Sequence, residues 1–205
     1  MLNITAIKGS ARENSHSTSL LEQVLEGCHS KAENTGLEID IKTITPFHMD
    51  INTCTSCFSC SETATCIFND DMDYWIDDNG FDNSEIIILA TPIYFNGMPS
   101  HVKKMIDRCQ PIYASKYDLN APIIDRNKKR RSILISCAGA PKYNDQFTAA
   151  RTVSGLFFKT INAPKFEELI VPNTDEQTPS ESPELMDKAL QMGEKVIEEF
   201  ASREE

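Results

Sequence analysis

The stretch EIIILATP, residues 85–92, contains a continuous run of aliphatic residues from Ile86 to Ala90, most of them β-branched, with no polar alternation. A strand that packs against helices on both faces of a parallel sheet has this composition, so we predict a buried central strand here. By contrast, Leu37, Ile39 and Ile41 alternate with charged residues. That alternation predicts a partly covered strand at the edge of the same sheet.

Strand-like and helix-like segments alternate on both sides of this central run. Further strands are predicted at residues 4–7, 132–139 and 166–171, and a short helix at residues 72–76. Apolar residues at helical spacing predict four longer helices, marked by Leu20, Leu21, Val24, Leu25 and Cys28; by Val102, Met105, Ile106 and Cys109; by Phe147, Ala150, Ser154, Phe157, Phe158 and Ile161; and by Leu185, Ala189, Met192, Val196 and Phe200. This order predicts an α/β fold, a flavodoxin-like doubly wound five-stranded parallel sheet of order 2-1-3-4-5.

Length and composition predict one domain over residues 1–205. The chain is 40% hydrophobic and 25% charged, which are ordinary globular values. Its longest apolar runs, residues 86–90 and 133–135, are too short to cross a bilayer, so no membrane partner is expected. The first residues, MLNITAIKGS, lack the features of a secretory signal, which predicts a cytoplasmic protein with reduced cysteines.

The charge excludes one class of function. A net charge of −11 argues against nucleic-acid binding, which draws on clustered Lys and Arg side chains. The only basic run, residues 126–131, is interpreted as a solvated loop edge. Two segments, a cysteine-rich loop at residues 45–71 and an extended loop at residues 110–130, show no regular period, and long irregular segments in a compact domain are usually functional.

Ligands of such sheets bind beyond the carboxyl ends of the strands, so we expect the loops after the first, third and fourth strands to form the site. The first, KGSARENSHST at residues 8–18, offers hydroxyls, one arginine and a helix N-terminus that could wrap a phosphate. It could equally be only a helix cap. The other two, residues 91–108 and 136–144, carry a Tyr-Phe pair and small residues, and each alone is weak evidence.

Four of the seven cysteines lie at C-x2-C-x2-C-x5-C spacing in residues 54–66. This compact spacing suits an iron-sulfur cluster better than a zinc site, which usually takes two CxxC pairs from separate turns. Cysteines that hold no metal are the third possibility. Cys28 and Cys109 lie on apolar helix faces and are expected in the core, and Cys137 is expected to be buried as well. Asp70, Asp71 and Asp73 are expected to cap the short helix that follows them.

The first loop resembles the phosphate loop of the NADPH-dependent FMN reductase superfamily, with Ala11 in place of the usual Pro. The second resembles that superfamily's SPxYxxxxPxxxKxxxDR pattern, matched by Thr91, Pro92, Tyr94, Pro99, Lys103, Asp107 and Arg108. The cysteine spacing resembles the iron-sulfur flavoprotein branch in particular. The resemblance implies that Ser10, Arg12, Ser15, Ser17 and Thr18 hold the FMN phosphate, and that Pro92, Ile93, Tyr94, Phe95, Asn96, Gly97, Ala138 and Gly139 flank the isoalloxazine and ribityl chain. It implies a [4Fe-4S] cluster on Cys54, Cys57, Cys60 and Cys66.

The function expected from this resemblance is that of an FMN-dependent oxidoreductase whose cluster relays single electrons to or from FMN. No side chain is assigned a catalytic role, because the flavin carries the chemistry. The donor would be NAD(P)H or a ferredoxin-like protein, the acceptor a small molecule such as a quinone or an oxygen species, and the assembly a homodimer or homotetramer. Two alternatives stay open: a cluster-free NAD(P)H-dependent FMN or quinone reductase, and a flavodoxin-type electron carrier or redox sensor without turnover.

Overall fold

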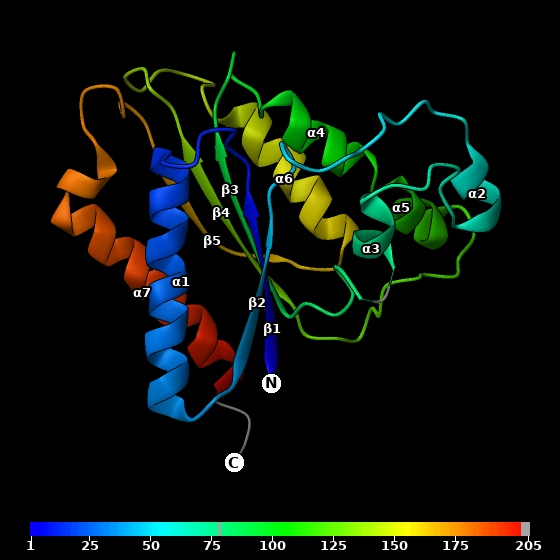
Figure 1. Cartoon of the computed structure of the whole chain (residues 1–205), viewed down its shortest axis with the longest axis horizontal. Helices are drawn as coiled ribbons and strands as arrows, with labels where there is room; N and C mark the ends of the chain where they lie inside the picture. The colour runs from blue at the N-terminus through cyan, green and yellow to red at the C-terminus, as the bar shows by residue number, and fades with distance from the viewer. Residues whose placement is uncertain (78, 202–205) are drawn as a thin grey trace.

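The computed structural model describes residues 1–77 and 79–201. Its strands are β1 (Leu2–Lys8), β2 (Ile39–Ile44), β3 (Ile86–Pro92), β4 (Arg131–Cys137) and β5 (Lys165–Val171). Over the described residues they form one five-stranded parallel sheet in the order β2-β1-β3-β4-β5 (Figure 1). The predicted fold class and strand order are confirmed.

Helices cover both faces of the sheet (Figure 1). They are α1 (His16–Thr35), α2 (Ser59–Thr63), α3 (Met72–Ile76), α4 (Ser100–Asp107), α5 (Gln110–Tyr117), α6 (Thr148–Thr160) and α7 (Pro183–Ala201), with a 3-10 turn at Pro179–Glu181. Among the described residues, no helix has both the length and the apolar character needed to span a membrane.

The core has two halves, and β3 contributes to both. Ile86, Ile88 and Ala90 pack in a cluster with α1 and α7, whereas Ile87 and Leu89 pack with α3, α4 and α6 on the opposite face. Every residue of β3 is buried, while β2 is mostly half-buried at the sheet edge. The contrast between central and edge strands therefore follows the sequence pattern.

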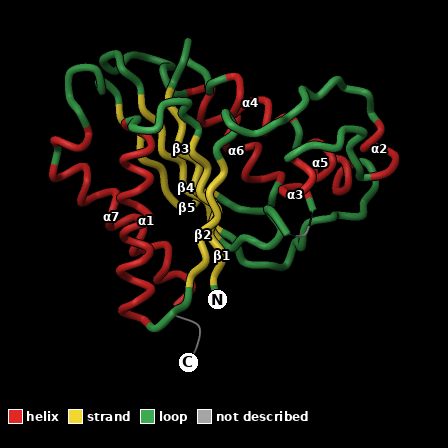
Figure 2. The backbone as a smooth tube through the Cα atoms, viewed as in Figure 1, coloured by secondary structure: helices red, strands yellow, loops and turns green. Residues whose placement is uncertain are grey.

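Helices α1 and α7 lie side by side with their backbones in close approach (Figures 1 and 2). A Cβ atom added to Gly193 would lie 1.9 Å from the Val24 carbonyl oxygen, and one added to Gly27 would lie 2.0 Å from the Leu190 oxygen. The Cys28 thiol donates to the Gly193 carbonyl at 3.6 Å across the same contact. Both positions therefore require glycine.

Two helices were not expected. The prediction that residues 110–130 lack regular structure is wrong for α5, which begins with Pro111 in its first turn and buries Ile112, Ala114 and Ser115. Its buried residues include one large aliphatic side chain, Ile112, so the sequence shows no apolar helical period. Cys109 accordingly does not extend α4, which ends at Asp107, but occupies the cap position of α5. The cysteine-rich loop likewise contains one short helix, α2.

Candidate functional site

The loops that follow β1, β3, β4 and β5 meet at one edge of the sheet, the upper edge in Figures 1 and 2. They surround a cavity of ≈ 290 Å³, which we call the edge cavity. Its lining residues are Arg12, Ser15, His16, Ser17, Pro92, Ile93, Tyr94, Cys137, Gly139, Ala140, Thr174 and Asp175. The structure therefore brings together the loops that the sequence singled out.

The first loop is both a helix cap and a polar wall of this cavity. Ser15 is the N-cap of α1: its Oγ accepts from the Thr18 backbone N–H at 3.2 Å and lies 3.2 Å from the Ser17 Oγ. The first turn of α1 contains no acidic side chain that would compete with an anion. Ser10 and Thr18 line an adjoining cavity of ≈ 360 Å³ instead, and Arg12 lines both.

The loop after β3 makes a tight turn with two left-handed residues. Tyr94 and Gly97 exchange backbone hydrogen bonds of 2.9 and 3.0 Å, and between them Phe95 and Asn96 have φ values of 49° and 61°. A left-handed backbone is costly for phenylalanine, and such strain concentrates at binding sites. The Phe95 ring is fully exposed. The Tyr143 hydroxyl donates to Asn96 Oδ1 and so joins this turn to the loop after β4.

Four of the residues expected around the flavin stand apart from the wall of the edge cavity. Phe95, Asn96 and Gly97 form the turn beyond it, and Ala138 is buried behind it with its N–H donating to Val171 at 2.9 Å. Pro92, Ile93, Tyr94 and Gly139 do line it.

The wall contributed by the loop after β5 was missed by sequence reasoning. Thr174 and Asp175 line the edge cavity, and the Asp175 carboxylate lies directly against Gly139. A Cβ added to Gly139 would lie 2.3 Å from Asp175 Oδ2, so a larger residue here would displace the Asp175 carboxylate. The signal was available, because the carboxyl end of a fifth parallel strand must reach the same edge of the sheet.

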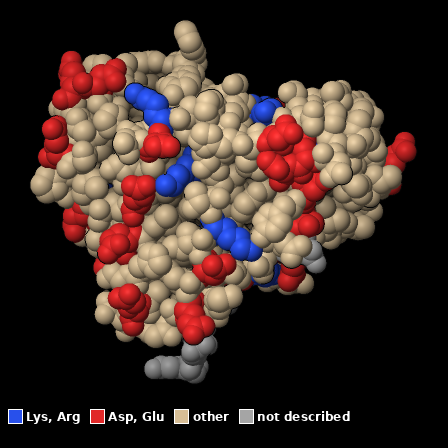
Figure 3. Space-filling model, in the orientation of Figure 1, with Lys and Arg blue, Asp and Glu red and all other residues tan. Residues whose placement is uncertain are grey.

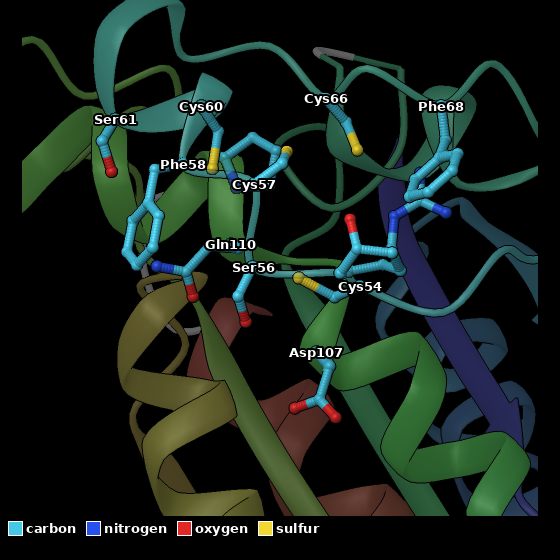
Figure 4. Close-up of a pocket in the computed structure, with 13 residues that line it drawn as sticks. Cys54, Ser56, Cys57, Phe58, Cys60, Ser61, Cys66, Phe68, Asp107 and Gln110 are labelled. Carbon is cyan, nitrogen blue, oxygen red and sulfur yellow. The ribbon is translucent and has the colours of Figure 1, made fainter.

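The cysteine-rich segment folds around a second cavity, of ≈ 180 Å³, which we call the cysteine cavity. Cys54, Cys57, Cys60 and Cys66 all line it, and their sulfur atoms lie on different sides of the same opening (Figure 4). Left-handed residues at Ser56, Phe58 and Ala64 turn the chain around it. All four cysteines carry free thiols.

These thiols face a shared cavity but do not converge on one point. Within residues 1–77 and 79–201, no group of three or more His, Cys, Asp or Glu side chains is arranged to hold a metal ion. A tetrahedral zinc site needs four sulfur atoms about 2.3 Å from one centre. The open arrangement therefore does not favour zinc. Burial raises the pKa of the Cys60 thiol, and the three neighbouring thiols add to that effect, although a backbone hydrogen bond opposes it.

The other three cysteines lie away from the cysteine cavity. Cys28, Cys109 and Cys137 are buried, and burial raises the pKa of each thiol to about 12. Cys28 and Cys109 are core residues, as predicted. Cys137 is buried too, but it also contributes to the wall of the edge cavity.

Arg108, which lines the cysteine cavity, forms a buried ion pair with Asp70. Arg108 Nη1 lies 2.5 Å from Asp70 Oδ2, and both side chains are 1% exposed. Asp70 also accepts hydrogen bonds from Asn52 and, through Oδ1, from the Met72 backbone at 3.1 Å. Asp70 therefore caps α3 as expected, because Met72 is the first residue of that helix. The Asp71 carboxylate does not cap α3 but accepts from the Asp50 backbone at 2.8 Å.

The Asp70 pair makes stability depend on pH in the acid range. Burial alone would raise the pKa of Asp70, but the hydrogen bonds from Arg108, Asn52 and Met72 lower it from 3.8 to about 2. Because the folded-state pKa is the lower one, this stabilisation, about 2 kcal/mol, is present above about pH 4 and is lost as the pH falls through about 2. In urea unfolding from pH 7 to pH 2.5, Asp70→Asn should show its largest deficit at neutral pH. A deficit independent of pH would contradict this account.

The loop after β1, which contributes Arg12 and Ser15 to the edge cavity, and the cysteine cavity lie at opposite ends of α4. At its N-terminal end, His101 Nε2 is 3.0 Å from the carbonyl oxygen of Gly9 in the loop after β1. At its C-terminal end, Asp107 and Arg108 line the cysteine cavity. A helix of eight residues is about 12 Å long. Within one chain, α4 therefore separates the edge cavity from the cysteine cavity.

Comparison with known proteins begins with the family described as NADPH-dependent FMN reductase, whose sequence model matches residues 2–123. The chain belongs to the NADPH-dependent FMN reductase family. The match spans β1 to α5, and so includes the loops after β1 and β3 and the cysteine-rich segment. The family resemblance noted in the sequence motifs is confirmed.

Among proteins of this family, the chain is similar to several named iron-sulfur flavoprotein. One from Archaeoglobus fulgidus is 30% identical over 110 residues, which are 54% of this chain and 46% of the relative. One from Methanocaldococcus jannaschii is 26% identical over 111 residues, 54% of this chain and 53% of the relative. The chain thus spans about half the length of the curated relatives it matches.

Solved structures share the fold over nearly the whole chain. An azoreductase from Bacillus anthracis has a TM-score of 0.68 at 15% identity and covers 96% of this chain and 98% of its own. An NAD(P)H:quinone oxidoreductase from Methanothermobacter marburgensis has a TM-score of 0.69 at 13% identity, with coverages of 95% and 98%. At these identities the likeness concerns the fold alone.

Proposed function

We propose that this protein is an FMN-dependent oxidoreductase. The observation that carries the proposal is the edge cavity, where a hydroxyl-rich helix N-terminus meets the loops after β3 and β4 at the carboxyl edge of a doubly wound sheet. Membership of the NADPH-dependent FMN reductase family supports it. When bound, FMN would supply the redox chemistry.

The chain's own residues would bind and orient the flavin. Arg12 and the amides at the start of α1 offer a positive end for the phosphate. Ser15 and Ser17 supply hydroxyls there, with Ser10 and Thr18 in the adjoining cavity. Pro92, Ile93 and Tyr94 offer backbone and apolar surface on one side, and Gly139 leaves room on the other.

The remaining residues expected at the flavin do not line the edge cavity and would act from outside it. Phe95, Asn96 and Gly97 would form a flap over the ring, held by the Tyr143 contact. Ala138 would support Gly139 from behind, since it is buried beneath the wall.

We further propose that Cys54, Cys57, Cys60 and Cys66 hold a [4Fe-4S] cluster. Four free thiols that surround a cavity, without converging on a point, suit a group larger than one ion. The buried Arg108 guanidinium on its wall suits an anionic, thiolate-bound group. The names of the archaeal relatives agree with this assignment. When bound, the cluster would relay single electrons to or from FMN.

One observation favours a cluster-free reductase as the second candidate. The fold is shared over nearly the whole chain with an NAD(P)H:quinone oxidoreductase. In this alternative NAD(P)H would be the donor and a quinone-like molecule the acceptor. In the cluster-bearing form the donor would be NAD(P)H or a ferredoxin-like protein.

The position of the two cavities bears on assembly. Because α4 lies between them within one chain, a homodimer or homotetramer could bring a cysteine cavity closer to the edge cavity of another copy. Light scattering of the purified protein tests this assembly.

The test of the proposed function is a visible spectrum of anaerobically purified protein, before and after reduction, together with iron, sulfide and zinc analysis. We expect flavin bands, iron and sulfide in equal amounts, and turnover with NADH or NADPH. Cys57→Ser should lose most of the iron, because its exposed thiol lines the cysteine cavity. Cys109→Ala, at a buried thiol outside that cavity, is the matched control and should keep it.

The possible outcomes separate the candidates. Flavin bands and turnover without iron would support the cluster-free reductase. Flavin bands without turnover on NADH, NADPH or a reduced ferredoxin would indicate a carrier or sensor. Failure to bind FMN at micromolar concentration would contradict the whole proposal.

A further inference from the structure

Arg108 is buried at the C-terminal end of α4 with only part of its guanidinium used. Its Nη1 donates to the Asn52 carbonyl at 2.9 Å and to Asp70 Oδ2 at 2.5 Å. Its Nε and Nη2 are buried and have no hydrogen-bond partner among the described residues. The Phe68 ring lies 5.0 Å from the guanidinium carbon.

Buried donors without a hydrogen-bond partner are costly, and a second buried arginine in this chain has a partner for each of its guanidinium nitrogens. Leaving a buried donor unpaired costs about 1–3 kcal/mol, and more for a charged group. The other fully buried arginine, Arg130, uses all of its nitrogens, with bonds to the carbonyls of Ser84, Asp125 and Asp82 at 3.0, 2.6 and 2.7 Å and a contact to the Asp82 carboxylate. At Nε and Nη2, Arg108 therefore lacks the oxygen acceptors that Arg130 has, and besides Asp70 the Cys66 thiol interacts with its guanidinium.

The surroundings of Arg108 indicate what kind of acceptor is missing. Arg108 lines the cysteine cavity, where the thiols of Cys54, Cys57, Cys60 and Cys66 are the main groups able to become anionic. Cys66 and Phe68 lie on the same side of that cavity (Figure 4). Asp107 is the one carboxylate on the wall, and its two oxygens bind Lys103 at 2.7 and 2.9 Å. The free N–H groups are thus available to sulfur.

We propose that Arg108 is a positioning residue for the cluster, whose Nε and Nη2 groups donate to its sulfur atoms and whose charge makes the cluster easier to reduce. The inference rests on the proposed cluster. Reduction adds negative charge, so a nearby guanidinium and N–H···S bonds favour the reduced form. Asp70 partly offsets that charge, and its removal should have the opposite effect.

The test compares midpoint potentials of the reconstituted holoprotein in an anaerobic dithionite titration. Arg108→Gln should shift the cluster potential to more negative values, and Asp70→Asn should shift it to less negative values. Arg108→Lys keeps the positive charge but loses the Nε and Nη2 donors of the guanidinium. Its potential should therefore shift less than that of Arg108→Gln. Lys104→Gln removes the same charge from α4 outside the cavity lining and should leave the potential unchanged.

The outcomes distinguish this inference from the function on which it rests. A wild-type potential in Arg108→Gln with full iron and sulfide would overturn the role of Arg108 and leave the cluster assignment standing. If Arg108→Gln does not fold, unchanged potentials in both Arg108→Lys and Asp70→Asn would overturn it equally. Wild-type protein that takes up no iron and sulfide on reconstitution would overturn both proposals.

Discussion

Gly193→Ala should lower the free energy of unfolding by about 3 kcal/mol, at the upper end of the usual cost of overpacking. The added Cβ would lie 1.9 Å from the Val24 carbonyl oxygen and 2.8 Å from the Cys28 backbone nitrogen. Both are backbone atoms of α1, so no side-chain rotation can relieve the contact. The helices would have to separate, which would open the core that they form with Ile86, Ile88 and Ala90.

Gly155→Ala in α6 is the matched control. A Cβ at Gly155 has no heavy atom within 4 Å, and the position lies inside a helix. Alanine there should stabilise the protein by about 0.5–1 kcal/mol through its higher helix propensity. Urea unfolding of both variants measures the difference. Equal stabilities would show that α1 and α7 do not approach as closely as in this structure.

Much of the fold was predictable because the pattern is local. The unbroken apolar run of β3 and the apolar-polar alternation that leads into β2 each indicate how many faces of the strand are covered. This difference alone separates the central strand from the edge strand. The close approach of α1 and α7 at Gly27 and Gly193 was not predictable, because the sequence around each glycine shows no pattern that requires it. Only the packing of two helices far apart in the sequence makes those glycines necessary. The helix α5 was missed because its buried residues are mainly small or polar, so its sequence shows no apolar period.

The loops that form the candidate site were predictable from the sequence, but some of its residues were not. Parallel strands place their carboxyl ends at one edge, so the order of the strands alone assigns the loops after β1, β3 and β4 to a common site. Thr174 and Asp175 escaped because their own sequence has no distinctive chemistry, although the same topological argument reaches them. The role of Arg108 also escaped: the motif marked its position, but its burial and unused donors arise only from the tertiary fold.

The acidic surface of the protein makes Arg12 important for binding an anionic cofactor. On the face shown in Figure 3, acidic side chains are scattered widely with a few Lys and Arg side chains between them. With a net charge of −11, the protein as a whole repels a phosphate. Binding of an anionic cofactor must therefore depend on local positive groups. Among the described residues, Arg12 is the one Lys or Arg side chain that lines the edge cavity, and His16 lines it as well.

Arg12→Ala should weaken FMN binding about 10- to 100-fold, because a charge-assisted hydrogen bond of about 1.5–3 kcal/mol to the phosphate is lost. Riboflavin has the same ring and no phosphate, so its affinity should stay unchanged. Fluorescence titration with both flavins measures the two effects. Lys165→Ala is the matched control: Lys165 begins β5, lines neither the edge cavity nor the adjoining one, and pairs with Glu168 at 2.8 Å, so its removal should change FMN affinity little. Equal losses for FMN and riboflavin in Arg12→Ala would show damage to the ring pocket and would argue against the phosphate assignment.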